Sequence, residues 1–413
     1  MSSRNWAAAF GLAVTLGARI SAADDSTCEQ LSRDRLTRCA AERSPELRGS
    51  RAGEEAAAGR RRAASSFLPS NPTLAGSVGS RSSASDRDFN WYLTLSQELE
   101  VAGQSGARTT AAERELDAAK LQTGFARAQL AQRAWEAWFE ALAAEERARL
   151  ATRLEKLTVD VAAAVRGMAK QGLVPELDAD VAEGGAFQAS QQRLERQATA
   201  RLARAELKLL TGGSPADGAV LQPLAAPGAE PVARAELIAL RRALEAAEAR
   251  VEAARRERVP NPSVSLFVQN DGFRERVLGV GLSVPIPLPE PVGRTRAGQL
   301  EESLALVTQA RAELERVERE VSLELTAATT AWEAMTQARA LFSSERIQRA
   351  EQRLDALAEQ IKAGRIGARE AVAAQQALVS QLEADIETRR ALCLASVRLR
   401  RAAGASLEEE LVP

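Results

Sequence analysis

Two long stretches of the chain carry apolar side chains that recur at steps of three and four residues. One lies within residues 104–170 and the other within residues 294–363. Neither stretch contains proline, which the interior of a helix excludes because proline lacks the N–H and clashes with the preceding turn. Each stretch therefore predicts one α-helix of about 100 Å at 1.5 Å rise per residue. The apolar stripe predicts lateral packing against other helices.

A shorter helical segment follows each long one after a glycine-containing turn. These returning segments span residues 176–211 and 368–403, and each would be about 54 Å long, roughly half of its partner. Further helices are expected upstream, at about residues 45–66 and 233–258. An end-to-end stack of an upstream and a returning helix would match the long helix in length, which predicts a two-layer helical cylinder of uniform height.

Four short segments alternate apolar and mostly polar residues with a period of two, as β-strands do. In the clearest of them, Phe89, Trp91, Leu93 and Leu95 alternate with Asn90, Tyr92, Thr94 and Ser96. The segments predict two β-hairpins, at residues 73–100 and 263–288.

Two interpretations of these hairpins remain open. They could form a small soluble sheet that covers a core with one face, or barrel strands with apolar residues towards lipid and polar residues towards a lumen. Four strands cannot close a pore-sized barrel, and an open edge in lipid leaves backbone groups unsatisfied. If the strands span a membrane, several chains must therefore share one barrel.

The chain contains an internal duplication. Asn71-Pro72-Thr73-Leu74 recurs as Asn261-Pro262-Ser263-Val264, at an offset of 190 residues. A second landmark, Lys170-Gln-Gly-Leu-Val174, pairs with Lys362-Ala-Gly-Arg-Ile366 at an offset of 192 residues. Two landmarks about a hundred residues apart that keep nearly the same offset indicate a repeat rather than shared helical composition.

The repeats and their boundaries predict the organisation of the chain. The first repeat is placed at residues 24–215 and the second at 233–413, with a Gly/Pro/Ala-rich linker or equatorial segment at 216–232. Residues 1–23 have a basic start, a short apolar run and small residues at the end, which predicts a secretory signal peptide. A first amphipathic helix is the alternative. No later segment has the apolar length of a transmembrane helix.

Composition narrows the function classes. Lys and Arg number 55 and Asp and Glu 56, which gives no basic face for nucleic acid. There is no histidine, and we find no nucleotide loop or nucleophile motif, so neither an enzyme nor a cofactor or metal site is expected. Export to an oxidising compartment would permit a Cys28–Cys39 bridge, which the spacing of 11 residues leaves open.

The chain resembles the TolC-like outer-membrane efflux channels, the outer membrane factor family. Four segments carry the resemblance, and they precede the strand pairs or lead into the long helices: Leu68-Pro-Ser-Asn-Pro-Thr-Leu74, Val259-Pro-Asn-Pro-Ser-Val264, Leu95-Ser-Gln-Glu-Leu-Glu100 with Gly103, and Val284-Pro-Ile-Pro-Leu288 with Gly293-Arg-Thr-Arg296. Their duplicated order covers nearly the whole mature chain. The Asn-Pro-rich second copy is most similar to the subgroup that serves heavy-metal or cation efflux pumps.

The resemblance implies a mainly α fold with a small β part. It implies a homotrimer whose transmembrane β-barrel has twelve strands, four from each chain, above a long α-helical barrel in the periplasm. The partners would be a periplasmic adaptor protein, an inner-membrane pump of the RND type and the lipid of the outer membrane. The expected function is a passive export duct in a tripartite efflux system, opened by adaptor docking at the helical hairpin tips.

The same resemblance assigns candidate site residues. The hairpin tips that would meet the adaptor are Gly172, Leu173, Val174, Gly364, Arg365 and Ile366. A ring of carboxylates at the tunnel mouth would be formed by Asp178 and Glu370, and such a ring attracts cations. An ordinary solvated helix face is the alternative for these acidic residues. A second acidic position of the family, one turn beyond Glu370, is occupied by Ala373 here.

Two other functions stay open at this point. A duct for protein or peptide secretion of type I would have the same fold, because the pump chooses the cargo. A periplasmic coiled-coil structural protein would explain the helices, but it would explain neither the two alternating hairpins nor the duplication.

Overall fold

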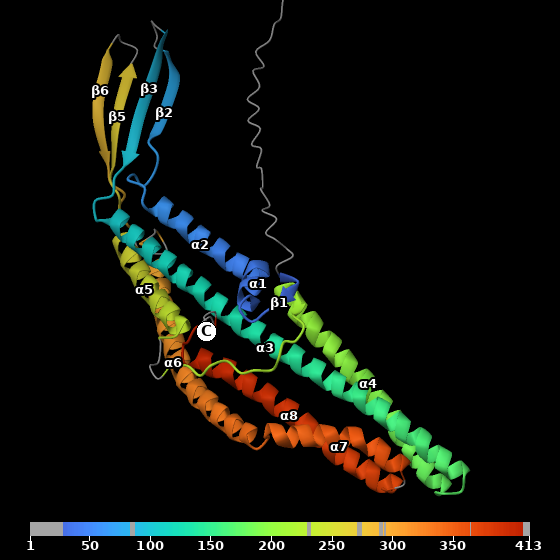
Figure 1. The fold of residues 1–413 in the computed structure, drawn as a ribbon. Helices are drawn as coiled ribbons and strands as arrows, with labels where there is room; N and C mark the ends of the chain where they lie inside the picture. The colour runs from blue at the N-terminus through green and yellow to red at the C-terminus, as the bar shows by residue number, and fades with distance from the viewer. Residues whose placement is uncertain are drawn as a thin grey trace, which may run out of the picture.

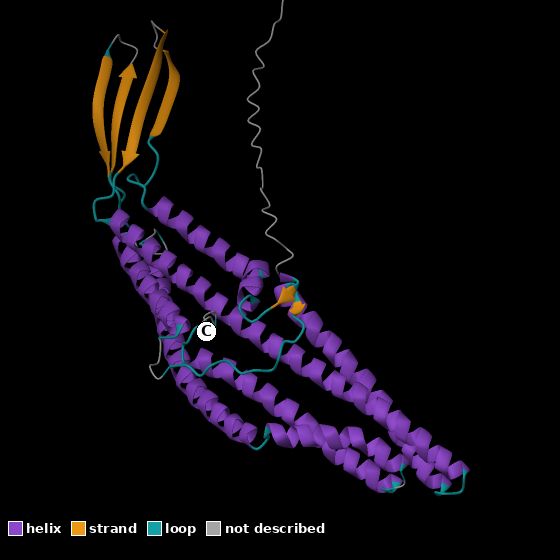
Figure 2. Ribbon diagram, viewed as in Figure 1, coloured by secondary structure: helices purple, strands orange, loops and turns teal. Residues whose placement is uncertain are grey.

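The computed structural model describes residues 28–82, 87–228, 233–270, 275–288, 292, 295–363 and 365–407. The predicted signal peptide at residues 1–23 lies outside this part of the chain. The described part is elongated, with a sheet at one end, helices along the body and two helical turns at the other end (Figure 1). It is mainly helical with a small β part, as expected (Figure 2).

The helices run nearly parallel to the long direction of the molecule. They are α1 (Leu36–Arg43), α2 (Pro45–Ala64), α3 (Gln104–Lys170), α4 (Glu176–Thr211), α5 (Ala235–Arg256), α6 (Ala297–Ala340), α7 (Ser344–Lys362) and α8 (Ala368–Ala402). The strands are β1 (Gln30–Leu31), β2 (Thr73–Ser82), β3 (Arg87–Glu98), β4 (Ser214–Pro215), β5 (Ser263–Asn270) and β6 (Arg276–Ser283).

Helix α3 occupies the residues expected for the first long helix, and glycines with positive φ lie beside both of its ends. Gly103 has a φ of 71° at the start, a conformation that side chains with a Cβ rarely adopt. At the other end Gly172 has a φ of 72°. Its N–H donates to Ala169 O at 2.9 Å, and the N–H of Leu173 donates to Met168 O at 3.0 Å. These bonds satisfy carbonyls that the helix end would otherwise leave free.

The prediction of one uninterrupted second long helix over 294–363 is wrong, because α6 ends at Ala340 and α7 begins at Ser344. Ser343 starts the new helix: the N–H of Arg346 lies 3.0 Å from its carbonyl and 3.3 Å from its hydroxyl. Carbonyls freed at the break accept from guanidinium groups, that of Phe342 from Arg339 and that of Leu341 from Arg346, both at 3.0 Å. In the sequence, the start of α7 is indicated by the Ser-Ser-Glu run at 343–345, which is typical of a helix start.

The sheet and the helices are arranged in the same lateral order along the whole length of the molecule. The strand order is β2-β3-β5-β6, with every neighbouring pair antiparallel. Beneath it α2 contacts α3, α3 contacts α5 and α5 contacts α6, while further down α4 contacts α3, α3 contacts α8 and α8 contacts α7. One lateral edge is therefore formed by β2, α2 and α4, and the other by β6, α6 and α7 (Figure 1).

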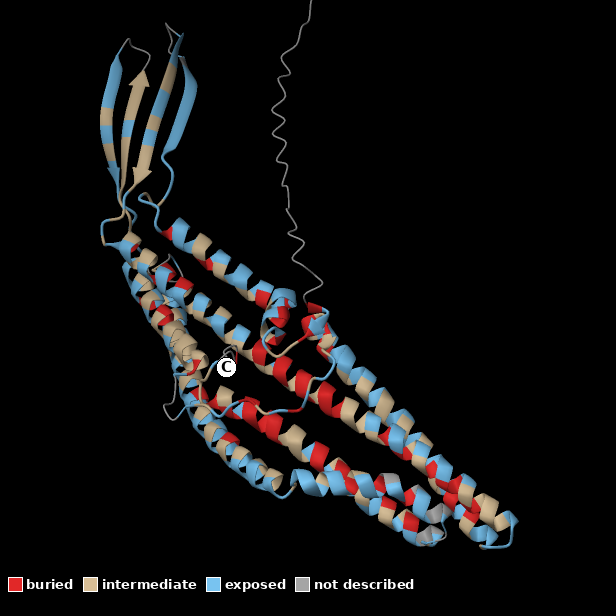
Figure 3. Cartoon of the chain, viewed as in Figure 1, coloured by how far each residue is buried: buried red, intermediate tan, exposed pale blue. Residues whose placement is uncertain are grey.

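The largest hydrophobic core lies midway along the helices, where α1, α3, α4 and α8 converge (Figure 3). Trp135, Trp138 and Phe139 of α3 are fully buried there. Burial also raises the pKa of the Cys393 thiol to about 12. The predicted linker at 216–232 contributes to this core through the buried side chains of Leu221 and Leu224.

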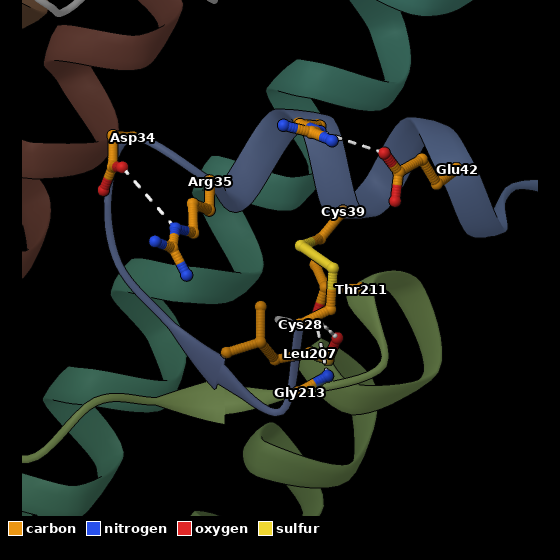
Figure 4. Close-up of a disulfide and its surroundings, with 9 residues drawn as sticks. Cys28, Asp34, Arg35, Cys39, Glu42, Leu207, Thr211 and Gly213 are labelled. Carbon is orange, nitrogen blue, oxygen red and sulfur yellow. Dashed lines mark hydrogen bonds and ion pairs between the residues drawn. A yellow bond between two sulfur atoms is a disulfide. The ribbon is translucent and has the colours of Figure 1, made fainter. Parts of the chain in front are cut away.

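A disulfide joins Cys28 to Cys39 beside this core (Figure 4). The spacing of the two cysteines had left open whether this bridge forms. It lies next to the short parallel pairing of β1 with β4, in which Gln30 is in register with Ser214. Closing a loop of this length stabilises a folded protein by about 3 kcal/mol in the chain-entropy account. The bridge therefore closes the loop between residues 28 and 39, and the β1–β4 pairing fastens this segment to the residues that follow α4.

Candidate functional site: a two-faced sheet and paired hairpin tips

The register of the sheet separates its residues into an apolar and a mainly polar face. Leu74, Leu95, Leu266 and Val280 are register partners in one row across the four strands. The next row on this face pairs Leu93 with Val268 and Leu278. Rows of the opposite face carry mostly small or polar residues: Thr73, Ser96, Ser265 and Gly281 in one, and Ser77, Tyr92, Gln269 and Val277 in another.

The apolar face is exposed in the isolated chain. Leu278 is 80% exposed and Val280 is 71% exposed. Neither face of the sheet is covered by another element of the described chain (Figure 3). A sheet over a soluble core would bury one of its faces, and such a cover is missing among the described residues, so this arrangement counts against the interpretation as a small soluble sheet over a core.

The polar face holds one pair of aromatic rings, whose role the sequence did not indicate. Tyr92 and Phe267 have ring centroids 5.9 Å apart. A Cβ at Gly279 would lie 2.3 Å from the ring of Phe267. The glycine therefore leaves room for this ring to lie against the neighbouring strand, an arrangement that stabilises the sheet.

The two hairpin turns that the sequence predicts as tips lie beside each other at the far end of the molecule (Figure 1). Val174 and Ile366 pack against one apolar cluster, whose buried members come from α3, α4, α7 and α8: Val161, Ala162, Val165, Ala179, Ala182, Leu357 and Ala371. Leu173 is 68% exposed, and Arg365 is exposed as well. Gly364 lies outside the described residues.

The two candidate carboxylates lie in corresponding places. Asp178 is in the first turn of α4, where it is half-buried, and Glu370 is in the first turn of α8, where it is exposed. Their neighbour Asp180 is engaged elsewhere, because it pairs with Arg166 of α3 at 2.8 Å while Glu183 pairs with the same guanidinium at 2.6 Å. Hydrogen bonding to Arg166 lowers the pKa of Glu183. The assignment of Asp178 and Glu370 to a tunnel mouth stays a prediction from the sequence.

Two other kinds of site are absent from the described residues. No group of three or more His, Cys, Asp or Glu side chains there is arranged to hold a metal ion. Within the same residues, every helix is too short or too polar to cross a membrane.

Known proteins share features with this chain. Residues 36–213 match the family model described as outer membrane efflux protein. Over this segment, which is less than half of the chain, the protein is similar to the outer membrane efflux protein family. This match confirms the resemblance inferred from the sequence. No curated protein matches the chain.

Solved structures extend the likeness over both predicted repeats of the chain. The outer membrane protein VceC of Vibrio cholerae has a TM-score of 0.72 and 21% identity, covering 91% of this chain and 96% of VceC. The CmeC outer membrane channel of Campylobacter jejuni has a TM-score of 0.75 and 14% identity, covering 90% and 85%. The MtrE outer membrane channel of Neisseria gonorrhoeae has a TM-score of 0.69 and 20% identity, covering 91% and 89%. At such identities the likeness establishes the fold.

Proposed function

We propose that three copies of this chain form a passive duct through the outer membrane and the periplasm. The observation that carries the proposal is the shared lateral order of strands and helices. It leaves β2, α2 and α4 on one edge and β6, α6 and α7 on the other. Joining unlike edges around an axis closes a ring and gives the unpaired backbone groups of β2 and β6 partners. Three copies would supply the twelve strands that the family resemblance implies.

In this assembly the apolar face of each sheet meets lipid and the polar face lines the lumen, the arrangement of membrane barrels. The helices continue the wall into the periplasm. At the far end the turns around Gly172 and Ile366 would dock a periplasmic adaptor, and an inner-membrane pump of the RND type would supply cargo. The exposure of Leu173 supports an external contact there. A type I secretion duct remains the alternative, since the wall is the same for either cargo.

The assembly has a direct test. The protein should leave outer membranes only in detergent, have the mass of three chains by light scattering, and conduct ions in planar bilayers. A water-soluble monomer without conductance would contradict the duct and would favour a periplasmic coiled-coil protein.

The tunnel mouth has its own test, Asp178→Ala combined with Glu370→Ala. Three copies would lose six carboxylates near the mouth, so block by multivalent cations should weaken. We expect roughly tenfold weaker block, which corresponds to about 1.4 kcal/mol of lost attraction. Single-channel recording with added trivalent cation measures it. Glu206→Ala, an exposed change far from the tip, is the control and should leave block unchanged. Unaltered block in the double variant would remove both residues from the mouth.

A further inference from the structure

A cavity opens beside the break between α6 and α7. Its volume is about 580 Å³, and it combines apolar and basic side chains. Phe342 and Leu378 contribute apolar surface, and Arg346, Arg349 and Arg353 contribute the basic groups. The three arginines are exposed, at spacings that place them on one side of α7. The cavity can therefore receive an acidic group together with an apolar side chain.

These arginines differ from most arginines of the helical body, which pair with a carboxylate. Among the described residues no carboxylate lies within ion-pair distance of Arg346, Arg349 or Arg353. Arg346 donates to the carbonyl of Leu341 at 3.0 Å, and Arg349 donates to that of Glu345 at 3.2 Å. The neighbouring side of α7 is occupied, because Leu354 is fully buried against α3 and α8. The arginines lie beside this buried side, where they are exposed and line the cavity, on a helix that belongs to the α6–α7 edge.

The other edge carries a complementary surface on α4. Leu194 is 58% exposed and Leu209 is 84% exposed, on the side of α4 that points away from α3. Glu195 is exposed beside Leu194. It accepts a hydrogen bond from Gln191 at 3.1 Å, and no described cation lies within ion-pair distance of it. This edge therefore offers a carboxylate next to an apolar side chain.

Two ion pairs place these surfaces at the same height. Arg193 of α4 pairs with Glu155 of α3 at 2.6 Å. Arg153, on the same turn of α3, lies 3.8 Å from Glu351 of α7. Residues 193 and 351 are therefore level, which puts Glu195 level with the stretch of α7 between Arg349 and Arg353. Rotation about the axis of a ring changes no heights, so the next copy meets this stretch at the height of its own Glu195.

We propose that Leu194 and Glu195 of one copy dock into the cavity at the α6–α7 break of the next copy. The carboxylate of Glu195 pairs with Arg349 and Arg353, and Leu194 packs towards Phe342 and Leu378. This inference rests on the proposed trimer and names a contact that holds its helical seam. A guanidinium fork beside an apolar anchor is the combination that dominates many protein interfaces.

Cross-linking in native outer membranes tests the contact. A chain with Glu195→Cys and Arg349→Cys, treated with a short bismaleimide, should give covalent dimers and trimers in SDS. The matched control pairs Arg349→Cys with Leu209→Cys, which lies on the same side of α4 but about 21 Å further along the helix, and it should give no ladder. The parent chain, whose one free cysteine is buried, should give none either. A ladder of equal intensity in the Leu209 control, or a cross-link only to a different protein, would overturn the contact.

An exchange of charges between the two residues provides a second test of the contact. Glu195→Arg places a cation against the three arginines and should cause loss of the SDS-resistant trimer at a temperature where the parent retains it. Adding Arg349→Glu should restore the trimer. Failure of both the ladder and the rescue in a chain that has the mass of three copies overturns this contact and leaves the duct intact. A monomeric parent chain overturns the duct itself.

Discussion

A chain with Leu93→Arg should fail to accumulate as a trimer in the outer membrane. Leu93 lies near the middle of β3, on the apolar face, in register with Gly76 and Val268. An arginine facing lipid at the middle of the bilayer costs about 2–4 kcal/mol, and a ring of three copies would carry that cost three times. We expect the trimer band in isolated outer membranes to fall below detection by immunoblot.

The control for this variant is Ser77→Arg, on the opposite face of the same sheet. Ser77 is exposed and in register with Tyr92, so its arginine would extend into water. This chain should assemble at the level of the parent. Equal loss in both variants would mean that the sheet does not meet lipid with one face, and normal assembly of Leu93→Arg would lead to the same conclusion.

Trp135→Ala should be the most destabilising single change in the helical body. The indole is fully buried, stacks on Phe139 with ring centroids 5.6 Å apart, and donates from Nε1 to Leu407 O at 3.0 Å. Truncation leaves a cavity and an unsatisfied carbonyl, for which we expect about 4 kcal/mol per chain. The measurement is the midpoint of urea unfolding, followed by far-UV circular dichroism.

A second tryptophan supplies the matched comparison. Trp332 on α6 is only half-buried, against the small cluster around Ala328. Its replacement by alanine should shift the midpoint much less than that of Trp135. If both variants unfold at the same urea concentration, the convergence of helices around Trp135 is not the stability centre that its burial indicates.

Local patterns predicted much of this fold because its elements are long and strictly periodic. The ends of α3 follow from the glycines at 103 and 172, and the alternation from Phe89 to Ser96 identifies β3. The interruption between α6 and α7 was not predicted, because the apolar stripe continues across it. A polar contact also stabilises the break, in which Arg339 donates to Phe342 O and to the buried Asp385 of α8 at 2.7 Å. Such a contact depends on tertiary placement.

The sequence predicted where each part of the candidate site lies along the chain, but not which parts contact one another in the fold. The two turns could be found from Gly172 and Ile366 alone. That they share one apolar cluster requires α7 to pack on α3, which no local pattern encodes. The pairing of β3 with β5 joins segments from different predicted repeats, so the continuous apolar face also emerges only from the folded chain. The roles of Asp178 and Glu370 remain predictions.

The cluster shared by the two turns has a consequence for how such chains can change in length during evolution. Because Val174 and Ile366 pack against the same cluster, an insertion in α3 would push one turn past the other unless α4, α7 and α8 lengthened equally. Viable insertions and deletions should therefore come as sets of four of equal size. Steps of seven residues should be favoured, since they keep each apolar stripe facing its neighbour. Ducts of different length would then differ by whole seven-residue steps in all four helices.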